Sequence, residues 1–313
     1  MSLIFVEDQI YAFLGPNDSQ FGFSSSISKH GETVAIGGPL FHDKETLNQG
    51  IVKVFKLYEN VEGVWESKDD FDLFGDEGDH FGHCLSLSED GSTLAVGAPQ
   101  LSSPNGKGYI IVYDLNTKEE IPKGFKIEGR VGSRIGAQVH IINATSITAS
   151  SSTGTIRSYK FEDGLWVEQE ELVIFSSSKE SEKALSFSSA SSGSFLTTGV
   201  SSKEEYEAGT ISAYQLKNDH WVKRGNDLNG FSKHSSIQIS EDGYFLAVGD
   251  ENVRVFEWNG EEWERRHSSN EIKGGLISLP NDASKMIVAR PTLSITEKGD
   301  SRGEVMTYKW KHE

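Results

Sequence analysis

The dominant pattern along the chain is a stretch of alternating apolar and polar residues, followed by a polar turn and a second, more apolar stretch. Alternation with a period of two predicts β-strands, because successive side chains of a strand point to opposite faces. Asp90-Gly91 and Asp242-Gly243 lie between such stretches and are typical of hairpin turns. The pattern therefore predicts antiparallel strand pairs.

This strand pair recurs six times, and the first two copies align without a gap. The copies are FGFSSSISKHGETVAIGGP from Phe21, FGHCLSLSEDGSTLAVGAP from Phe81, IGAQVHIINATSITAS from Ile135, KALSFSSASSGSFLTTG from Lys183, KHSSIQISEDGYFLAVG from Lys233 and KGGLISLPNDASKMIVARP from Lys273. A third strand-like segment follows each copy, beginning near Gly50, Gly108, Gly154, Gly209, Asn252 and Gly303. A tryptophan marks a fourth strand at Trp65, Trp166, Trp221 and Trp263. Four strands per repeat are typical of a propeller blade.

We therefore predict an all-β fold, a six-bladed β-propeller with four-stranded blades, as a single domain over residues 1–313. Its blades begin near residues 21, 81, 135, 183, 233 and 273. The sixth copy stops after its third strand, and FLGPNDSQFG, ending at Gly22, aligns with LFGDEGDHFG, ending at Gly82. Residues 1–20 are thus expected to supply a connector and an N-terminal strand closing the last blade, which leaves no unpaired sheet edge.

The charge balance disfavours two classes of partner. Asp and Glu number 47 against 30 Lys and Arg, a formal net charge of −17, which opposes binding to nucleic acid and to anionic membranes. Cys84 is the single cysteine, and the N-terminus lacks the basic start and apolar run of a signal peptide. We expect a soluble monomer, intracellular rather than secreted, with no nucleic acid bound and no membrane insertion.

The FG-x-S-x-S-x-S-x-D-G-x-T-x-A-x-G-x-P pattern at Phe21 to Pro39 and Phe81 to Pro99 resembles the FG-GAP repeat of integrin α-chain heads. The resemblance implies a binding platform for proteins or glycans, and the seven blades usual in that family make a seventh blade the alternative. Integrin-like members hold calcium in the hairpin between the first two strands. The loops here, such as Glu89-Asp90-Gly91, offer at most two carboxylates where calcium takes about 6–8 oxygens. We therefore expect neither a metal nor a cofactor.

Three features are candidates for catalysis or metal binding. Gly299 to Gly303 fits G-x-S-x-G, but it leads into a strand, whereas that motif needs a strand-to-helix elbow. Asp79, His80 and His83 are potential metal ligands, yet side chains three apart on a strand diverge. The many serines have no base beside them. The sequence therefore predicts no catalytic residue and favours ordinary hydrogen bonding for the histidines.

At two positions of the innermost strands, some repeats carry a large polar residue where the other repeats carry a small one. His140 takes the position of Ser26, Ser86, Ser188 and Ser278, and Gln138 and Gln238 enlarge the same face. Since innermost strands surround the axis of a propeller, these three residues are candidates for a polar pocket in the central channel. A buried histidine bonded to backbone groups is the simpler interpretation.

The loops between second and third strands vary most, and in a four-stranded meander they emerge on the same face as the connectors between blades. Variable loops on a rigid scaffold are where recognition usually occurs. The candidate binding residues on these loops are His42, Asp43, Lys44, Lys203, Glu204, Tyr206, Glu297, Asp300 and Arg302. The first hypothesis is a non-catalytic scaffold for a protein or glycan partner. The alternatives are a glycan hydrolase or lyase with its site at the channel, and a structural or assembly component.

Overall fold

A computed structural model describes residues 15–29, 32–44, 46–57, 65–67, 72–116, 124–174, 183–189, 194–202, 209–218, 220–231, 236–250, 252–266, 272–273, 276–278, 285–294 and 301–309. In these parts of the chain the regular secondary structure is entirely β. Among them there is no helix of the length and apolar character that a membrane crossing needs.

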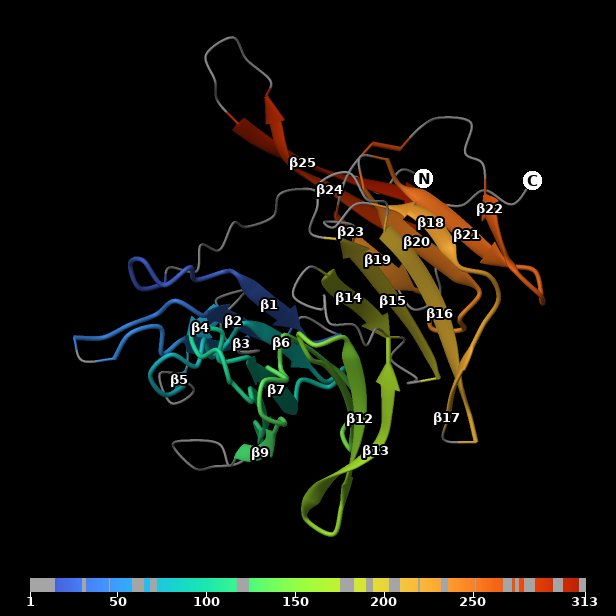
Figure 1. Cartoon of the computed structure of the whole chain (residues 1–313). Helices are drawn as coiled ribbons and strands as arrows, with labels where there is room; N and C mark the ends of the chain where they lie inside the picture. Colours follow the sequence, from blue (N-terminus) through green and yellow to red (C-terminus); the bar gives the residue numbers. More distant parts are fainter. Residues whose placement is uncertain are drawn as a thin grey trace.

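The described strands form six antiparallel sheets (Figure 1). The first three contain β1 Ser24–Ile27, β2 Thr33–Gly38, β3 Ile51–Leu57, β4 Trp65–Ser67 and β5 Leu73–Phe74; then β6 Cys84–Leu87, β7 Thr93–Ala98, β8 Tyr109–Asp114 and β9 Gly124–Glu128; then β10 Gln138–Asn143, β11 Ser146–Ser150, β12 Thr155–Glu162 and β13 Leu165–Val173. The last three contain β14 Lys183–Ser189, β15 Phe195–Ser202, β16 Gly209–Lys217, β17 His220–Lys223 and β18 Leu228–Phe231; then β19 Ser236–Ile239, β20 Phe245–Gly249, β21 Arg254–Trp258 and β22 Trp263–Arg266; then β23 Leu276–Ser278, β24 Lys285–Ser294 and β25 Ser301–Lys309.

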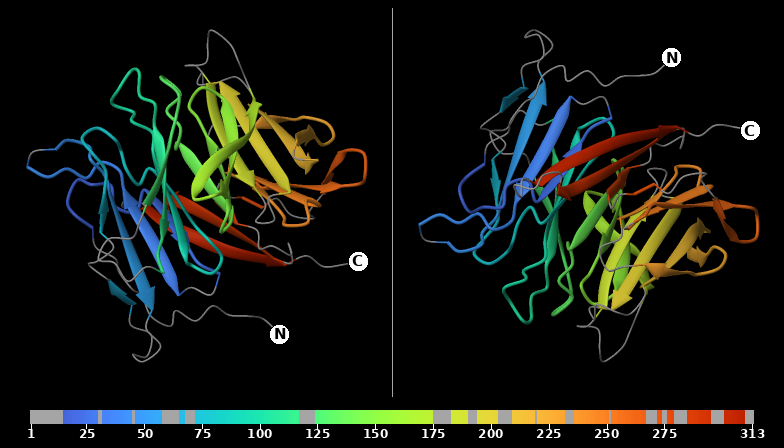
Figure 2. Two further views of the ribbon diagram at one scale, coloured as in Figure 1. Left: turned by 90° about the horizontal axis from the view of Figure 1, so that it is seen from below. Right: turned by 90° about the horizontal axis from the view of Figure 1, so that it is seen from above.

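The first four strands of each sheet, or three in the sixth, form a meander in which consecutive strands pair, and the sheets follow one another around a common centre (Figure 2). The chain is thus an all-β propeller. Six sheets are the number that the repeats predict, and each of the four tryptophans lies in the predicted fourth strand. The sixth sheet has three described strands; the N-terminal strand predicted to complete it falls in residues 1–14, outside the described residues.

The hydrophobic core lies between neighbouring sheets. One cluster joins Val54 of the first sheet to Leu85 and Val96 of the second, and another joins Ile110 of the second to Val139 of the third. The second strand of a sheet is buried on both faces, as in β7, where every residue after Thr93 is buried. The sequences of such strands are continuous runs of apolar residues, because a neighbouring sheet covers each of their two faces.

Small residues let adjacent inner strands approach closely and bond across the seam between sheets. A side chain at Gly97 would place its Cβ 2.2 Å from the Gly136 carbonyl oxygen of the next sheet. The Ile141 N–H donates to Ser86 Oγ at 2.9 Å, and the Leu87 N–H donates to Ser26 Oγ at the same distance. The small-residue face that the sequence placed around the channel is therefore used for hydrogen bonds between sheets.

Two strands were not predicted. β5 pairs with β3, and β18 pairs with β16, so that the connector leaving each of these sheets returns along its third strand. These additions bring the connectors against the loops between second and third strands, where the candidate site lies.

Candidate functional site

The connectors and the long loops meet around one concave region. A pocket of about 670 Å³ lies between the loop joining β2 to β3, the connector between the first two sheets, and the loop joining β7 to β8. Its lining is contributed by Leu47, Asn48, Glu77, Gly78, Asp79, Gln100, Ser102, Ser103, Asn105, Gly106 and Lys107. Alternate loops of a meander thus come together on one face, called below the loop-bearing face.

Backbone hydrogen bonds join the three walls of this pocket. The Gly78 N–H donates to the Leu47 carbonyl at 2.8 Å, which fixes the connector to the first loop. The Gln100 N–H donates to the Asp79 carbonyl at 3.1 Å, which fixes the second loop to the connector. The Gly106 N–H bonds back to the Ser103 carbonyl at 3.1 Å. A pocket held in this way is largely formed before a ligand arrives, which lowers the ordering cost of binding.

Asp79 is the buried centre of the pocket floor, with a relative exposure of 4%. Its carboxylate accepts hydrogen bonds from Tyr109 Oη at 2.6 Å, Gln100 Nε2 at 2.9 Å and the Asp76 N–H at 2.9 Å. Burial, and then the neighbouring carboxylate, raise the pKa of Tyr109 well above its usual range, so that the phenol keeps its proton and donates it. Both carboxylate oxygens of Asp79 accept hydrogen bonds from the surrounding segments, so this side chain holds the loops together.

The two histidines near Asp79 also bond to backbone groups. His80 Nδ1 lies 3.0 Å from the Gly78 carbonyl oxygen, and His83 Nδ1 lies 3.2 Å from the Ala137 carbonyl oxygen in the next sheet. Burial lowers the pKa of His83 and outweighs the opposing effect of the Ala137 carbonyl. Within the described residues, no three His, Cys, Asp or Glu side chains are grouped so that they could hold a metal ion.

The rim of the pocket offers uncommitted polar groups. Glu77, Ser102 and Asn105 are exposed, and their side chains make no hydrogen bond with another described residue. Lys107 Nζ lies 3.9 Å from Glu128, a long and exposed ion pair. Hydroxyl, amide, carboxylate and ammonium groups supply both donors and acceptors to a ligand. Leu47, 64% exposed, adds an apolar surface.

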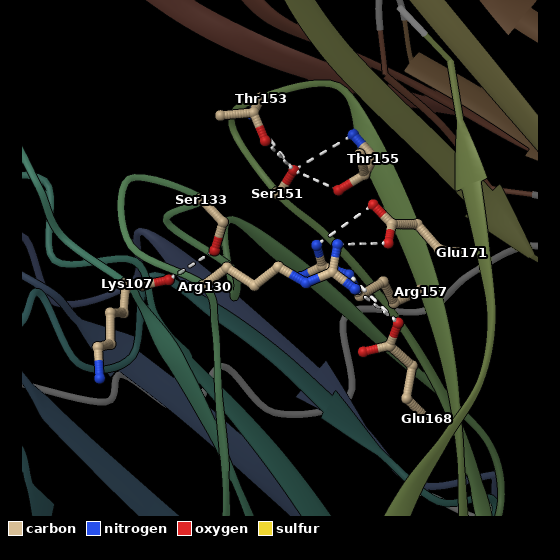
Figure 3. A network of polar contacts seen from close by, with 9 residues as sticks. All are labelled: Lys107, Arg130, Ser133, Ser151, Thr153, Thr155, Arg157, Glu168 and Glu171. Carbon is tan, nitrogen blue, oxygen red and sulfur yellow. Dashed lines mark hydrogen bonds and ion pairs between the residues drawn. The ribbon is translucent and has the colours of Figure 1, made fainter. Parts of the chain in front are cut away.

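A network of two arginines and two glutamates supports the wall that carries Lys107. Arg157, whose side chain is 4% exposed, approaches Glu171 at 3.3 Å and Glu168 at 3.7 Å. Arg130 reaches the same two carboxylates at 2.8 and 3.4 Å, so the four charges balance (Figure 3). Three residues after Arg130, Ser133 Oγ donates to the Lys107 carbonyl at 2.9 Å. The network therefore fixes the third sheet to the connector that holds the pocket wall.

The predicted binding residues of the first loop lie on the same loop as the pocket but do not line it. Asp43 Oδ1 accepts from the N–H and Oγ1 of Thr46, both at 2.9 Å, and His42 Nδ1 lies 3.2 Å from the Leu40 carbonyl oxygen. Lys44 is exposed beside them. Arg302 is in β25, where it pairs with Leu293. The other predicted binding residues lie outside the described residues: Lys203, Glu204, Tyr206, Glu297 and Asp300.

The pocket residues of the connector and second loop were not among the predicted site residues. The sequence singled out as variable the loops between second and third strands, to which Gln100 belongs, and it singled out Asp79 as a possible ligand. It held no sign that these segments meet. One feature of the sequence could have indicated the pocket. Asp79 lies two residues before Phe81-Gly82, and the equivalent position in the neighbouring connectors is a serine, Ser19 or Ser133. All three are buried.

The predicted channel residues are on the innermost strands β10 and β19. His140 pairs with Thr148, as Ser86 pairs with Ala95, so His140 and Ser86 hold the same register. Burial lowers the pKa of His140, against an opposing effect of Glu241. His140 Nδ1 and Thr148 Oγ1 are both buried and have no hydrogen-bond partner, as judged among the residues that the structure describes. Gln138 and Gln238 are half-buried on the same inner strands.

Comparisons with known proteins define the fold and leave the activity open. No protein-family model matches the chain, and no curated protein matches its sequence. Among solved structures it is similar to a protein provisionally named a 6-phosphogluconolactonase from Bacteroides fragilis, at 13% identity and a TM-score of 0.55, covering 80% of this chain and 84% of that one. Another is the β-propeller domain of Cps50 (Swd1) from Myceliophteria thermophila, at 10% identity and a TM-score of 0.45, covering 94% and 98%.

Proposed function

We propose that this propeller is a non-catalytic binding scaffold of the FG-GAP kind, which recognises a protein or glycan partner through its loop-bearing face. The observation that carries the proposal is the pocket between the first two sheets. Its walls are joined by backbone hydrogen bonds, while Glu77, Ser102 and Asn105 on its rim have hydrogen-bonding groups to spare. A rigid concave site with a few convergent polar groups is the usual form of a recognition site.

The chemistry of the rim favours a neutral, polar partner. Glu77 and Lys107 carry opposite charges, so the rim selects for neither a cation nor an anion. Leu47 and Leu101, 64% and 40% exposed, belong to the two loops that flank the pocket. A saccharide, with hydroxyl groups around an apolar ring face, or a polar peptide segment with one apolar side chain, would match this combination.

The proposal is tested by filling the pocket. Ser102→Trp places a bulky side chain on the rim, and Asn116→Trp is the matched control, because Asn116 is exposed on the turn after β8, on the opposite face. Both variants are immobilised beside the unaltered protein and probed with a printed glycan array and with extract of the source cells. We expect Ser102→Trp to lose the glycans or proteins that Asn116→Trp retains. Equal capture by both variants would show that this face is not the binding site.

An enzymatic function is the alternative, since one similar structure carries the name of a sugar-phosphate lactonase. At 13% identity that likeness concerns the fold alone. A phosphorylated substrate also calls for clustered cations, whereas Lys107 is accompanied by Glu77 in the pocket and by Glu128 beside it. We therefore expect the protein to leave the spontaneous hydrolysis rate of 6-phosphogluconolactone unchanged. Acceleration that the Ser102→Trp variant abolishes would favour the enzyme.

A further inference from the structure

The residues that line the pocket on the loop-bearing face distinguish between its two candidate partners, a saccharide and a peptide segment. Among the described residues, none of those in the lining carries an aromatic ring. The C–H face of a saccharide ring is flat and packs best against a flat aromatic side chain. The floor carboxylate, Asp79, already accepts hydrogen bonds on both oxygens, so it is not available to a pair of sugar hydroxyl groups. The lining therefore favours a peptide.

Three exposed aliphatic side chains lie on the segments around the pocket. Leu47 is 64% exposed on the first loop, Leu101 is 40% exposed on the second loop, and Val131 is 70% exposed on the connector between the second and third sheets. Covering such side chains stabilises a complex, because apolar surface is removed from water. These three residues, called below the aliphatic row, suit the aliphatic side chains of a peptide.

The members of the aliphatic row follow one another across the pocket, because the segments that carry them are in contact. The Gly78 N–H donates to the Leu47 carbonyl at 2.8 Å, and a Cβ added at Gly78 would lie 3.6 Å from Ser102 Cβ. On the far side of the second loop, the Gly132 N–H donates to the Asn105 carbonyl at 3.3 Å. The second and third members of the row immediately precede Ser102 and Gly132 in the sequence.

Carboxamide groups lie between the members of the row. Asn48 of the first loop and Asn105 of the second loop both line the pocket, and their side chains make no hydrogen bond with another described residue. A carboxamide has a donor and an acceptor side by side, which match the C=O and N–H of a peptide group. In an extended peptide such backbone groups recur between side chains at a regular spacing. The sequence of aliphatic, amide and aliphatic groups therefore fits an extended chain.

Charges without an ion-pair partner lie at the two ends of the row. At the first end, Asp76 and Glu77 are exposed and form no ion pair with another described residue. At the other end, Arg134 Nη2 donates to the Ser103 carbonyl at 3.1 Å, while Arg134 Nε is buried without a partner and no carboxylate of the described residues pairs with this guanidinium. The site thus has an acidic end and a basic end, which complement a partner with the opposite order of charges.

We propose that the pocket and the aliphatic row bind an extended peptide segment with aliphatic side chains, a basic residue at the Asp76–Glu77 end and a carboxylate at the Arg134 end. This inference rests on the pocket being the recognition site proposed above, and it narrows the partner from a protein or glycan to a polypeptide. The aliphatic side chains contribute most of the affinity, and the charges at the two ends set the direction of the chain.

The first test compares peptides with glycans. The whole chain, Ser102→Trp and the control Asn116→Trp are immobilised and probed with a phage-displayed library of random linear peptides and with a printed glycan array. We expect the unaltered protein and Asn116→Trp to enrich peptides that place aliphatic residues between a basic residue and a carboxylate, and Ser102→Trp to enrich none of them. Glycans that bind and depend on Ser102, with no peptide enriched, overturn the inference and leave the proposed function standing. If no peptide and no glycan depends on Ser102, the proposed function fails as well.

The second test reverses a charge on the surface, where the fold is not disturbed. Glu77→Lys should weaken a selected peptide about fivefold in a fluorescence-anisotropy titration, because it turns an exposed attraction into a repulsion. The same peptide with its basic residue replaced by glutamate should prefer Glu77→Lys to the unaltered protein. Glu32→Lys, on the exposed turn between β1 and β2 on the opposite face, should leave the affinity of both peptides unchanged.

The aliphatic row is tested with the same titration. Leu47→Ser should weaken the selected peptide roughly tenfold, because it removes the apolar surface that the peptide covers. Full affinity in Leu47→Ser, or a peptide preference that Glu77→Lys does not reverse, would overturn the inference.

Discussion

Replacing Ser86 by alanine tests the bonding across the seams. Ser86 Oγ accepts the Ile141 N–H at 2.9 Å, and both residues are buried, so alanine leaves a backbone donor without a partner and without access to water. An unsatisfied buried donor costs about 1–3 kcal/mol. With the unfolding entropy of a 313-residue chain, this loss lowers Tm by roughly 2–5 °C. Ser86→Cys should fall in between, because Cys84 Sγ accepts the Val139 N–H at 3.3 Å.

The assay is urea unfolding followed by tryptophan fluorescence, with amide exchange of Ile141 as a local readout. Ser102→Ala is the control, because Ser102 is exposed and its side chain makes no hydrogen bond with another described residue. We expect a lower unfolding midpoint and faster exchange at Ile141 for Ser86→Ala alone. If Ser86→Ala and Ser102→Ala unfold at the same urea concentration, the seam hydrogen bonds do not stabilise the propeller.

Three further predictions concern other parts of the fold. Tyr109→Phe removes the 2.6 Å donor to the buried Asp79 carboxylate and should lower the free energy of unfolding, measured in urea, by about 1.5–3 kcal/mol. An unchanged free energy of unfolding would contradict the role of Asp79 in holding the loops. Burial holds the pKa of His83 below its usual 6.5, so the unfolded chain binds more protons at this site below that pH. The contribution of His83 to stability should therefore be constant above about pH 6.5 and fall below it, and His83→Asn should make the acid decline of the free energy of unfolding shallower. An unchanged decline would contradict this role. Arg224 is surrounded by aromatic rings, with its guanidinium carbon 4.4 Å from the Trp258 ring centroid. Arg224→Ala should therefore lower the free energy of unfolding more than Arg224→Met, which keeps the packing. An equal decrease in both variants would make the charge the main contributor.

The repeating architecture could be predicted from the sequence because each strand carries its own signal. Alternation, hairpin dipeptides and tryptophan spacing are local features, and they indicated the sheets and their strand order. β5 and β18 carry no such signal: they are short pieces of connector that become strands only because a third strand with free edge groups lies beside them. Local patterns cannot reveal a pairing that depends on tertiary position.

The sequence predicted which face of the propeller carries the candidate site, but not which residues form the pocket. Variability indicated the loops between second and third strands, two of which border the pocket. The pocket is formed by three segments separated by many residues, and their contact follows from the connector geometry at Asp79. The inner serines illustrate the same limit. Their spacing showed a small-residue face, whereas their bonds to the next sheet depend on how closely two strands approach, which glycines such as Gly97 permit.

Amide hydrogen exchange on the protein with and without its captured partner would examine the loop-bearing face itself. The proposal predicts slower exchange on binding in residues 77–79, 102–103 and 105–107, which line the pocket, and no change in the turn at residues 115–116 on the opposite face. Protection confined to the opposite face, or to the inner strands, would contradict it and would move the binding site away from the pocket.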